Sequence, residues 1–259
     1  MIAKTGSFIA RIWSGWGTLA GVFMIIALWQ VGYESFGALV LPDPLQSFSQ
    51  LLTIFQQSEG LDYIAITARR AMIGFALASL IGACIGLLAG WSNTLAILCR
   101  PFLTVMLGVP PIAWIVLALL WFGGSDGTPV FTVFISTVPL VFAGALQGIR
   151  MRDATLDEMA DSFEIPWWDK VWHVQIPQVI SYLFPAWATA LGLSWKVVVM
   201  AELLSSSEGI GAGLAEARVN IDTVTTMSWI VAVVGLLLFL EGFFLNPIKE
   251  HVEGWRNDV

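Results

Sequence analysis

The residues best suited to a specific contact lie in one stretch, 154–177, where acidic and apolar side chains share helical spacing. Thr155 followed by Glu158 has the spacing of a capping box, which predicts that a helix starts at Thr155. The apolar residues at 156, 159, 160 and 163 then recur at i, i+3, i+4 and i+7 and form one face. Four carboxylates stay off that face: Asp157, Glu158, Asp161 and Glu164. Such a helix can dock on a protein, because apolar anchors and carboxylates suit a partner's pocket and its arginines.

The same stretch predicts a bend. Ile165 precedes Pro166, and the residue before a proline avoids the helical region, so the first helix should end there. Pro166 suits the first turn of a second helix over 167–176. A connection between antiparallel spans needs only a few residues, so two helices in one loop indicate a docking surface. The alternative is a hairpin that only lies on the lipid.

The chain offers no constellation for catalysis or metal binding. Its two histidines, His173 and His251, and its two cysteines, Cys84 and Cys99, have no partners at ligand spacing. The Gly-x-x-x-x-Gly-Lys-Ser/Thr loop that cradles nucleotide phosphates is absent from the sequence. We therefore predict no enzyme activity, no metal and no bound cofactor on this chain.

Three residues in or beside apolar stretches are candidates for lining a translocation path: Lys196, Glu202 and Trp114. An ionisable residue at membrane depth is costly and usually faces a cavity or the bundle interior. Lys196 can meet an anionic solute, pair structurally with a carboxylate such as Glu241, or snorkel to an interface. Trp114 also fits an aromatic belt or packing beside a gate.

The elements that position these residues are membrane spans. Of 259 residues, 57% are hydrophobic and 12% charged, against about 25% charged in soluble domains. Lipid must therefore cover much of the surface, and the apolar runs predict an all-α polytopic protein. Six stretches approach the roughly 20 residues that cross a bilayer: 17–36, 68–91, 102–122, 130–149, 180–204 and 227–245. The net charge of −7 argues against a nucleic-acid partner.

A stripe of small residues recurs every four positions along the second predicted span: Gly74, Ala78, Gly82, Gly86 and Gly90. Small residues let membrane helices approach closely. The stripe predicts a packing face, either within a static bundle or as a mobile face at the path or a dimer interface.

Lysine and arginine placement sets the expected orientation. With the N-terminus in the cytoplasm, most of them fall inside, although the Arg69–Arg70 pair breaks this rule. We expect a bacterial inner-membrane protein with cytoplasmic tails at 1–16 and 249–259, one transmembrane domain over 17–248 and a cytoplasmic loop at 150–179. The outer segments are then 37–67 and 205–226, and 47–55 predicts a short amphipathic helix.

The loop 154–177 resembles the cytoplasmic EAA loop of binding-protein-dependent ABC importer permeases. That pattern is Glu-Ala-Ala, three residues, Gly, nine residues and Ile-x-Leu-Pro; here Glu158, Met159 and Ala160 occupy its start and Pro177 its end. Two departures are Met159 for the central Ala and Glu164 for the Gly. The Gly would allow a left-handed backbone, where Glu costs about 1 kcal/mol. Pro166 is expected to help make the bend.

Further segments resemble one branch of that superfamily, the nitrate, sulfonate and taurine permeases. They are the Val-Leu-Pro-Asp-Pro at 40–44, the Gly-Val-Pro-Pro-Ile-Ala-Trp at 108–114, the Leu-Trp-Phe-Gly at 120–123, the stretch 195–203 and the Gly-Ile-Gly at 209–211. The resemblance covers roughly residues 35–255.

The resemblance implies a six-helix type I ABC importer permease fold and a set of partners. These are two ATP-binding subunits holding ATP and Mg, a second permease copy in a homodimer, and a periplasmic solute-binding protein. The ATP-binding subunit is expected to dock on the loop, with Pro177 at its end and these residues at its contact: Asp157, Glu158, Met159, Ala160, Asp161, Phe163 and Glu164. The implied solute is a small anion such as a sulfonate, taurine or nitrate.

Two other classes of membrane protein are weighed against the importer. An ion-gradient-driven carrier predicts an inverted repeat and broken helices with polar groups at the midplane. A membrane-embedded enzyme needs His, Cys or carboxylates clustered within the spans. The sequence shows neither pattern clearly, and a carrier would leave the long helical loop unexplained.

Overall fold

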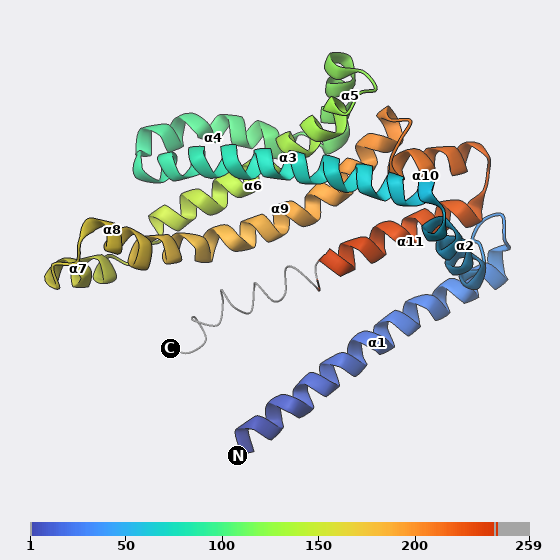
Figure 1. Ribbon diagram of the computed structural model, residues 1–259, viewed down its shortest axis with the longest axis horizontal. Coiled ribbons are helices and arrows are strands. Elements are labelled where there is room, and N and C mark those ends of the chain that lie inside the picture. Colours follow the sequence, from blue (N-terminus) through green and yellow to red (C-terminus); the bar gives the residue numbers. More distant parts are fainter. Residues whose placement is uncertain (1, 241, 243–259) are drawn as a thin grey trace.

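The computed structural model describes residues 2–240 and 242, and within them the chain forms helices joined by turns, without strands. The elements are α1 Ile2–Phe36, α2 Pro44–Gln56, α3 Ser58–Trp91, α4 Asn93–Gly108, α5 Pro111–Phe122, α6 Gly127–Arg150, α7 Ala154–Ser162, α8 Trp167–Lys170, the π-helix η1 Val171–Gln175, α9 Ile176–Ser205, α10 Ile210–Val219 and α11 Thr223–Leu240 (Figure 1). The predicted all-α class is confirmed.

The core of the bundle is α6, which packs between α3 and α9 (Figure 1). Small residues allow both contacts, because Gly144 lies against Ala186 of α9 and Gly148 lies against Val179. Val141 and Ala145 of α6 join Leu183 and Ala190 of α9 in a buried cluster. Among the candidate spans that the structure describes, α6 has the largest buried share.

The small-residue stripe of α3 faces α6. A Cβ at Gly74 would lie 2.7 Å from Val133, one at Gly82 would lie 3.0 Å from the carbonyl oxygen of Val138, and one at Gly86 would lie 2.6 Å from that of Phe142. Gly90 lies equally close to Ile149. The stripe therefore packs against α6 within the same chain.

The stretch predicted as the third span, 102–122, is not one straight helix. Two helices occupy this region, α4 and α5, and their axes meet at 97°. Pro110 and Pro111 carry no N–H, so they cannot bond the carbonyls one turn earlier, and the residue before a proline avoids the helical region. Val109 is accordingly extended, with φ −85° and ψ 122°. Prolines 101, 139 and 185 lie inside helices without ending them.

Within the described residues, four helical stretches are long and apolar enough to cross a membrane: Ser58–Trp91, Gly127–Arg150, Trp167–Ser205 and Thr223–Leu240. The bent α4–α5 pair would make a fifth. The predicted span 17–36 lies within α1, which already begins at Ile2. Part of the predicted span 227–245 and the whole of the 249–259 tail lie outside the described residues. The count of six spans stays a prediction.

The bundle has two distinct ends (Figure 1). One carries α7 and α8, and the other carries α2, α10 and the loop between α9 and α10. Helix α2 confirms the short helix predicted near 47–55 and packs on α11, where Ser228 donates a hydrogen bond to the carbonyl of Ser47 at 2.8 Å. Helix α1 stands away from the bundle and is tied at its end by Trp29, which donates to the carbonyl of Pro42 at 2.9 Å.

Candidate functional site

The hairpin at the α7 end begins with a capped helix. Asp153 is the N-cap of α7, and its carboxylate accepts the Thr155 amide at 2.8 Å. The predicted cap at Thr155 is therefore wrong by two residues. Asp153 fits better because a carboxylate at a helix start also meets the positive end of the helix dipole.

The hairpin turns at Glu164. This residue has φ +52°, the left-handed conformation that glycine adopts at least cost. The turn is closed by the Ile165 amide, which donates to the carbonyl of Ala160 at 3.1 Å, as in a helix C-cap motif. Pro166 then precedes α8, which continues through η1 into α9. The bend is thus made by a left-handed residue with a proline two positions later.

Side-chain contacts hold α7 against α8, η1 and the start of α9. Lys170 lies 2.7 Å from the carboxylate of Asp161 and 3.9 Å from that of Asp157. Gln175 donates to Asp157 at 3.3 Å, and Gln178 accepts the Asp153 amide at 2.7 Å. Asp157 and Asp161 are therefore engaged within the chain. Half-buried Pro177 lies in the first turn of α9.

The outward side of α7 remains open. Met159 is 49% exposed and Phe163 is 75% exposed, whereas Ala160 is fully buried. Glu158 and Glu164 are exposed, and neither forms an ion pair within the described chain. An apolar pair flanked by two exposed carboxylates, on a helix held by side-chain contacts, can receive a protein partner.

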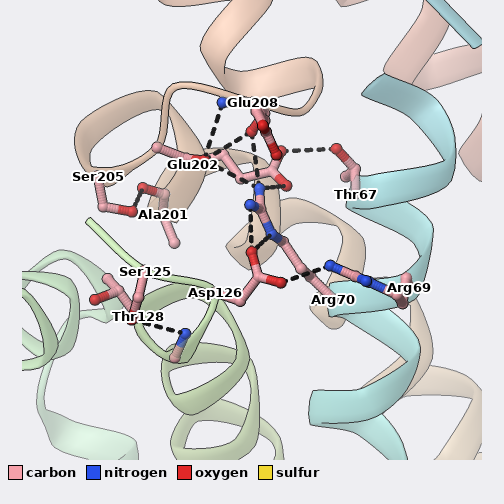
Figure 2. A network of polar contacts seen from close by, with 12 residues as sticks. Thr67, Arg69, Arg70, Ser125, Asp126, Thr128, Ala201, Glu202, Ser205 and Glu208 are labelled. Atoms are coloured by element: carbon pink, nitrogen blue, oxygen red, sulfur yellow. Dashed lines mark hydrogen bonds and ion pairs between the residues drawn. The ribbon is translucent and has the colours of Figure 1, made fainter. Parts of the chain in front are cut away.

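A second polar site lies at the opposite end of the bundle (Figure 2). Arg70 of α3 is 3% exposed, and its guanidinium reaches two carboxylates at once: Glu202 of α9 at 2.8 Å and Asp126 before α6 at 2.5 Å. It also donates to Ser206 at 3.1 Å and to the carbonyl of Glu208 at 2.8 Å. One arginine therefore ties α3 to the start of α6 and to the α9–α10 turn.

Glu202 is fully buried, and both of its carboxylate oxygens are satisfied. One accepts from Arg70, and the other accepts from Thr67 at 2.7 Å and from the Gly211 amide at 3.1 Å. A Cβ at Gly209 or Gly211 would come within 2.5 Å of the Glu202 side chain. The Gly-Ile-Gly motif thus lets backbone approach this carboxylate.

The three path candidates are not brought together into one site by these contacts. Glu202 belongs to the buried network. Lys196 is exposed on α9, and no ion pair joins it to another described residue; Glu241 lies outside the described residues. Trp114 of α5 is half-buried, and its indole Nε1 is buried with no hydrogen-bond acceptor in the described chain.

Sequence reasoning missed the roles of Arg70, Asp126 and Thr67. One signal was available, because the Arg69–Arg70 pair violated the expected charge distribution of the loops. Burial with two carboxylates explains Arg70. Arg69 lies 2.5 Å from Asp126 with both side chains more than half exposed, and it completes the group.

Comparisons with known proteins place the chain among transport permeases. The pattern of the family described as "Binding-protein-dependent transport system inner membrane component" matches residues 79–255. A Bacillus subtilis permease named for aliphatic sulfonates, SsuC, is 30% identical over 93% of this chain and 89% of its own. The taurine transport permease TauC of Escherichia coli is 25% identical over 94% and 90%. Other relatives are named for bicarbonate and nitrate.

The fold has a solved counterpart. A chain of the MetNI methionine ABC transporter, in inward-facing conformations, aligns with a TM-score of 0.59 at 14% identity. The match covers 72% of this chain and 93% of that one. The two chains therefore share a fold over the aligned part.

Proposed function

Because the chain belongs to the family of binding-protein-dependent transport system inner membrane components, we propose that α7 is the element on which a separate ATP-binding subunit acts. The chain is a multi-pass membrane protein and the permease subunit of an ABC importer. It is not an enzyme, since the importer hydrolyses ATP on a separate subunit. The relatives favour this function over an ion-gradient-driven carrier.

The observation that carries the proposal is that α7 is held in place while its apolar side chains stay exposed. The helix is capped by Asp153 and held by Lys170, yet Met159 and Phe163 stay open to solvent. Burying these two apolar side chains against a partner removes them from water. Buried aromatic anchors supply much of the affinity of protein interfaces. Since α8, η1 and α9 follow without a break, a pull on α7 passes directly into a candidate span.

The finer assembly is part of the same proposal. Two copies of the ATP-binding subunit, with ATP and Mg, contact two permease copies in a homodimer, and a periplasmic binding protein delivers the solute. The α7 end and the N-terminus lie in the cytoplasm, and the α2–α10 end lies outside. Closure of the ATP-binding subunits draws the two α7 helices together and opens the path outward, and hydrolysis resets it.

The proposed solute is a small oxyanion of the sulfonate, taurine, nitrate or bicarbonate kind. Support comes from the relatives, several of which are named for such anions. Exposed Lys196 is the cation that we place along the path, because a positive charge at membrane depth favours an anion crossing there. Specificity is assigned to the binding protein, which selects the solute before delivery.

The test of α7 uses the complex co-expressed with its ATP-binding subunit. Combining Met159→Ala, Phe163→Ala and Glu158→Lys is expected to lower both retention of that subunit and ATP-dependent uptake by about tenfold or more, since anchors of this kind dominate interfaces. Glu34→Lys, an exposed charge reversal on α1, is the matched control and should leave both unchanged.

Full retention and uptake in the triple variant would overturn the role of α7. Transport by the purified chain alone in vesicles without ATP would favour the carrier. Elution of the triple variant as a single species on size exclusion separates lost docking from lost folding.

A further inference from the structure

A cavity of about 270 Å³ opens at the α2–α10 end of the molecule. It lies between α2 and the start of α3 on one side and α10 and the start of α11 on the other. The two chain segments that form it, 37–67 and 205–226, are the ones that the sequence places outside the membrane. Pockets for whole small molecules usually hold about 300–1,000 Å³, so this one suits a single side chain.

The floor of the cavity is aromatic. Tyr63 of α3 and Trp229 of α11 stack with ring centroids 6.1 Å apart and planes 26° from parallel. Trp229 is buried and Tyr63 is half-buried, and both line the cavity. The electron-rich faces of such rings attract an ammonium or guanidinium group.

The rim is acidic. Glu59, Glu216 and Asp222 line the cavity with exposed side chains. Glu59 accepts only a 3.5 Å contact from the Tyr63 hydroxyl, and neither Glu59 nor Glu216 has an ion pair among the described residues. The Asp222 carboxylate accepts hydrogen bonds from the Thr225 amide at 3.0 Å and the Thr225 hydroxyl at 2.7 Å. These hydrogen bonds lower the pKa of the Asp222 carboxyl, so it stays charged near neutral pH.

Neighbouring charges leave the acidic excess in place. An adjoining hollow of about 480 Å³ shares Glu59 and Tyr63 and adds Asp62, Glu208 and Arg69. Arg69 is already paired with Asp126. Arg218 stands two positions after Glu216 on α10, and residues at that spacing do not share a helix face.

The lining excludes two simpler occupants. An anionic solute would be repelled by the three carboxylates. For a metal ion, no group of three or more His, Cys, Asp or Glu residues comes together closely enough anywhere in the described part of the chain. A cation carried on an apolar stem fits, because the stem and head can lie on the aromatic floor while the charge meets the rim.

We propose that this cavity receives a lysine or arginine side chain from the solute-binding protein when that protein docks on the importer. The inference rests on the proposed function and adds the chemistry of the contact. The Tyr63–Trp229 floor and the carboxylates of Glu59 and Glu216 recognise the partner's basic residue, and the surrounding acidic surface steers its approach.

The experiment uses the complete complex in lipid nanodiscs and the solute-loaded binding protein encoded with it. Glu59→Lys combined with Glu216→Lys is expected to weaken binding-protein affinity by about tenfold or more, because like charges at a docking site repel. Wild-type affinity should fall as salt rises, and the double variant should lose that dependence. Basal ATP hydrolysis and subunit retention should match the wild type.

A crosslinking measurement identifies the occupant. With Glu216→Cys in a chain that also carries Cys84→Ser and Cys99→Ser, a short reagent with a maleimide and a succinimidyl ester should join the cavity to a lysine of the binding protein. Mass spectrometry would place that lysine on the docked face. Crosslinking to a second permease copy, or calcium binding that is lost in Glu216→Gln, would overturn the proposal. Unchanged affinity in the double variant would do so as well, while ATP-coupled uptake by the wild type would leave the proposed function intact.

Discussion

Arg70 holds two carboxylates that differ in their access to water. Glu202 is fully buried, whereas the side chain of Asp126 is about half exposed at 51%. Removing the partner of a buried charge costs far more stability than removing the partner of an exposed charge, because water can solvate only the exposed charge. The Arg70–Glu202 pair is therefore the part of the network on which the fold depends.

Replacing Arg70 by Met is expected to destabilise the chain by about 3–5 kcal/mol, since Glu202 is left buried and unpaired. Arg69→Met is the control one residue away: its pair with Asp126 is exposed, and its loss should cost about 0–1 kcal/mol. The midpoint of unfolding in mixed detergent measures both. Equal losses in the two variants would contradict the assigned roles.

A companion variant separates charge from packing in this network. Adding Glu202→Gln to Arg70→Met removes the unpaired charge, and the amide oxygen can still accept from Thr67 and Gly211. Stability should partly recover. No recovery would mean that the guanidinium acts mainly by filling space.

The residue scale is also where sequence reasoning reached least far. The partners of Arg70 lie 56 and 132 positions away, so no local pattern predicts that they meet. Membrane depth alone makes Glu202 a path candidate. Its hydrogen-bond partners could not be predicted, because only the fold brings Thr67 and the Gly211 amide to the same carboxylate.

At the scale of elements, local chemistry predicted most helices. Periodicity predicted α7, and Pro166 predicted a bend close to Glu164, the residue that makes it, because both signals act within a few residues. Hydropathy does not locate the break between α4 and α5, because it measures length and composition and does not register that two adjacent prolines remove successive amide donors. The 97° bend follows from that loss.

The turn after α7 contains a residue in a strained backbone conformation, Glu164. Its φ of +52° is disfavoured for a residue with a Cβ, so Glu164→Gly should stabilise the turn by about 1 kcal/mol. The Ile165 amide, bonded to Ala160, should then exchange with deuterium about fivefold more slowly.

The control for that prediction is Glu158→Gly. It lies six positions earlier, inside α7, and should have the opposite effect on stability. Glycine inside α7 costs about 1 kcal/mol, so exchange in the hairpin should speed up. Faster exchange in Glu164→Gly as well would show that the left-handed conformation is not the strained feature of this turn.

At the scale of the whole molecule, the two ends differ in what they offer a partner. The α7 end presents Met159 and Phe163, and the α2–α10 end presents an aromatic cavity with an acidic rim. The candidate span Trp167–Ser205 joins the two ends, since it begins beside α7 and ends at the Arg70 network. A displacement at α7 therefore has a continuous helical route to the opposite surface.

Because one candidate span separates the two ends, their sidedness can be tested with two single cysteines. After Cys84→Ser and Cys99→Ser, exposed Asn220→Cys should react with an impermeant maleimide in right-side-out vesicles. Exposed Ser162→Cys should react only after permeabilisation. Positive charge retained on the cytoplasmic side is the physical reason for this orientation. The reverse labelling would invert the proposed topology, and labelling of both sites from outside would mean that α9 does not cross the membrane.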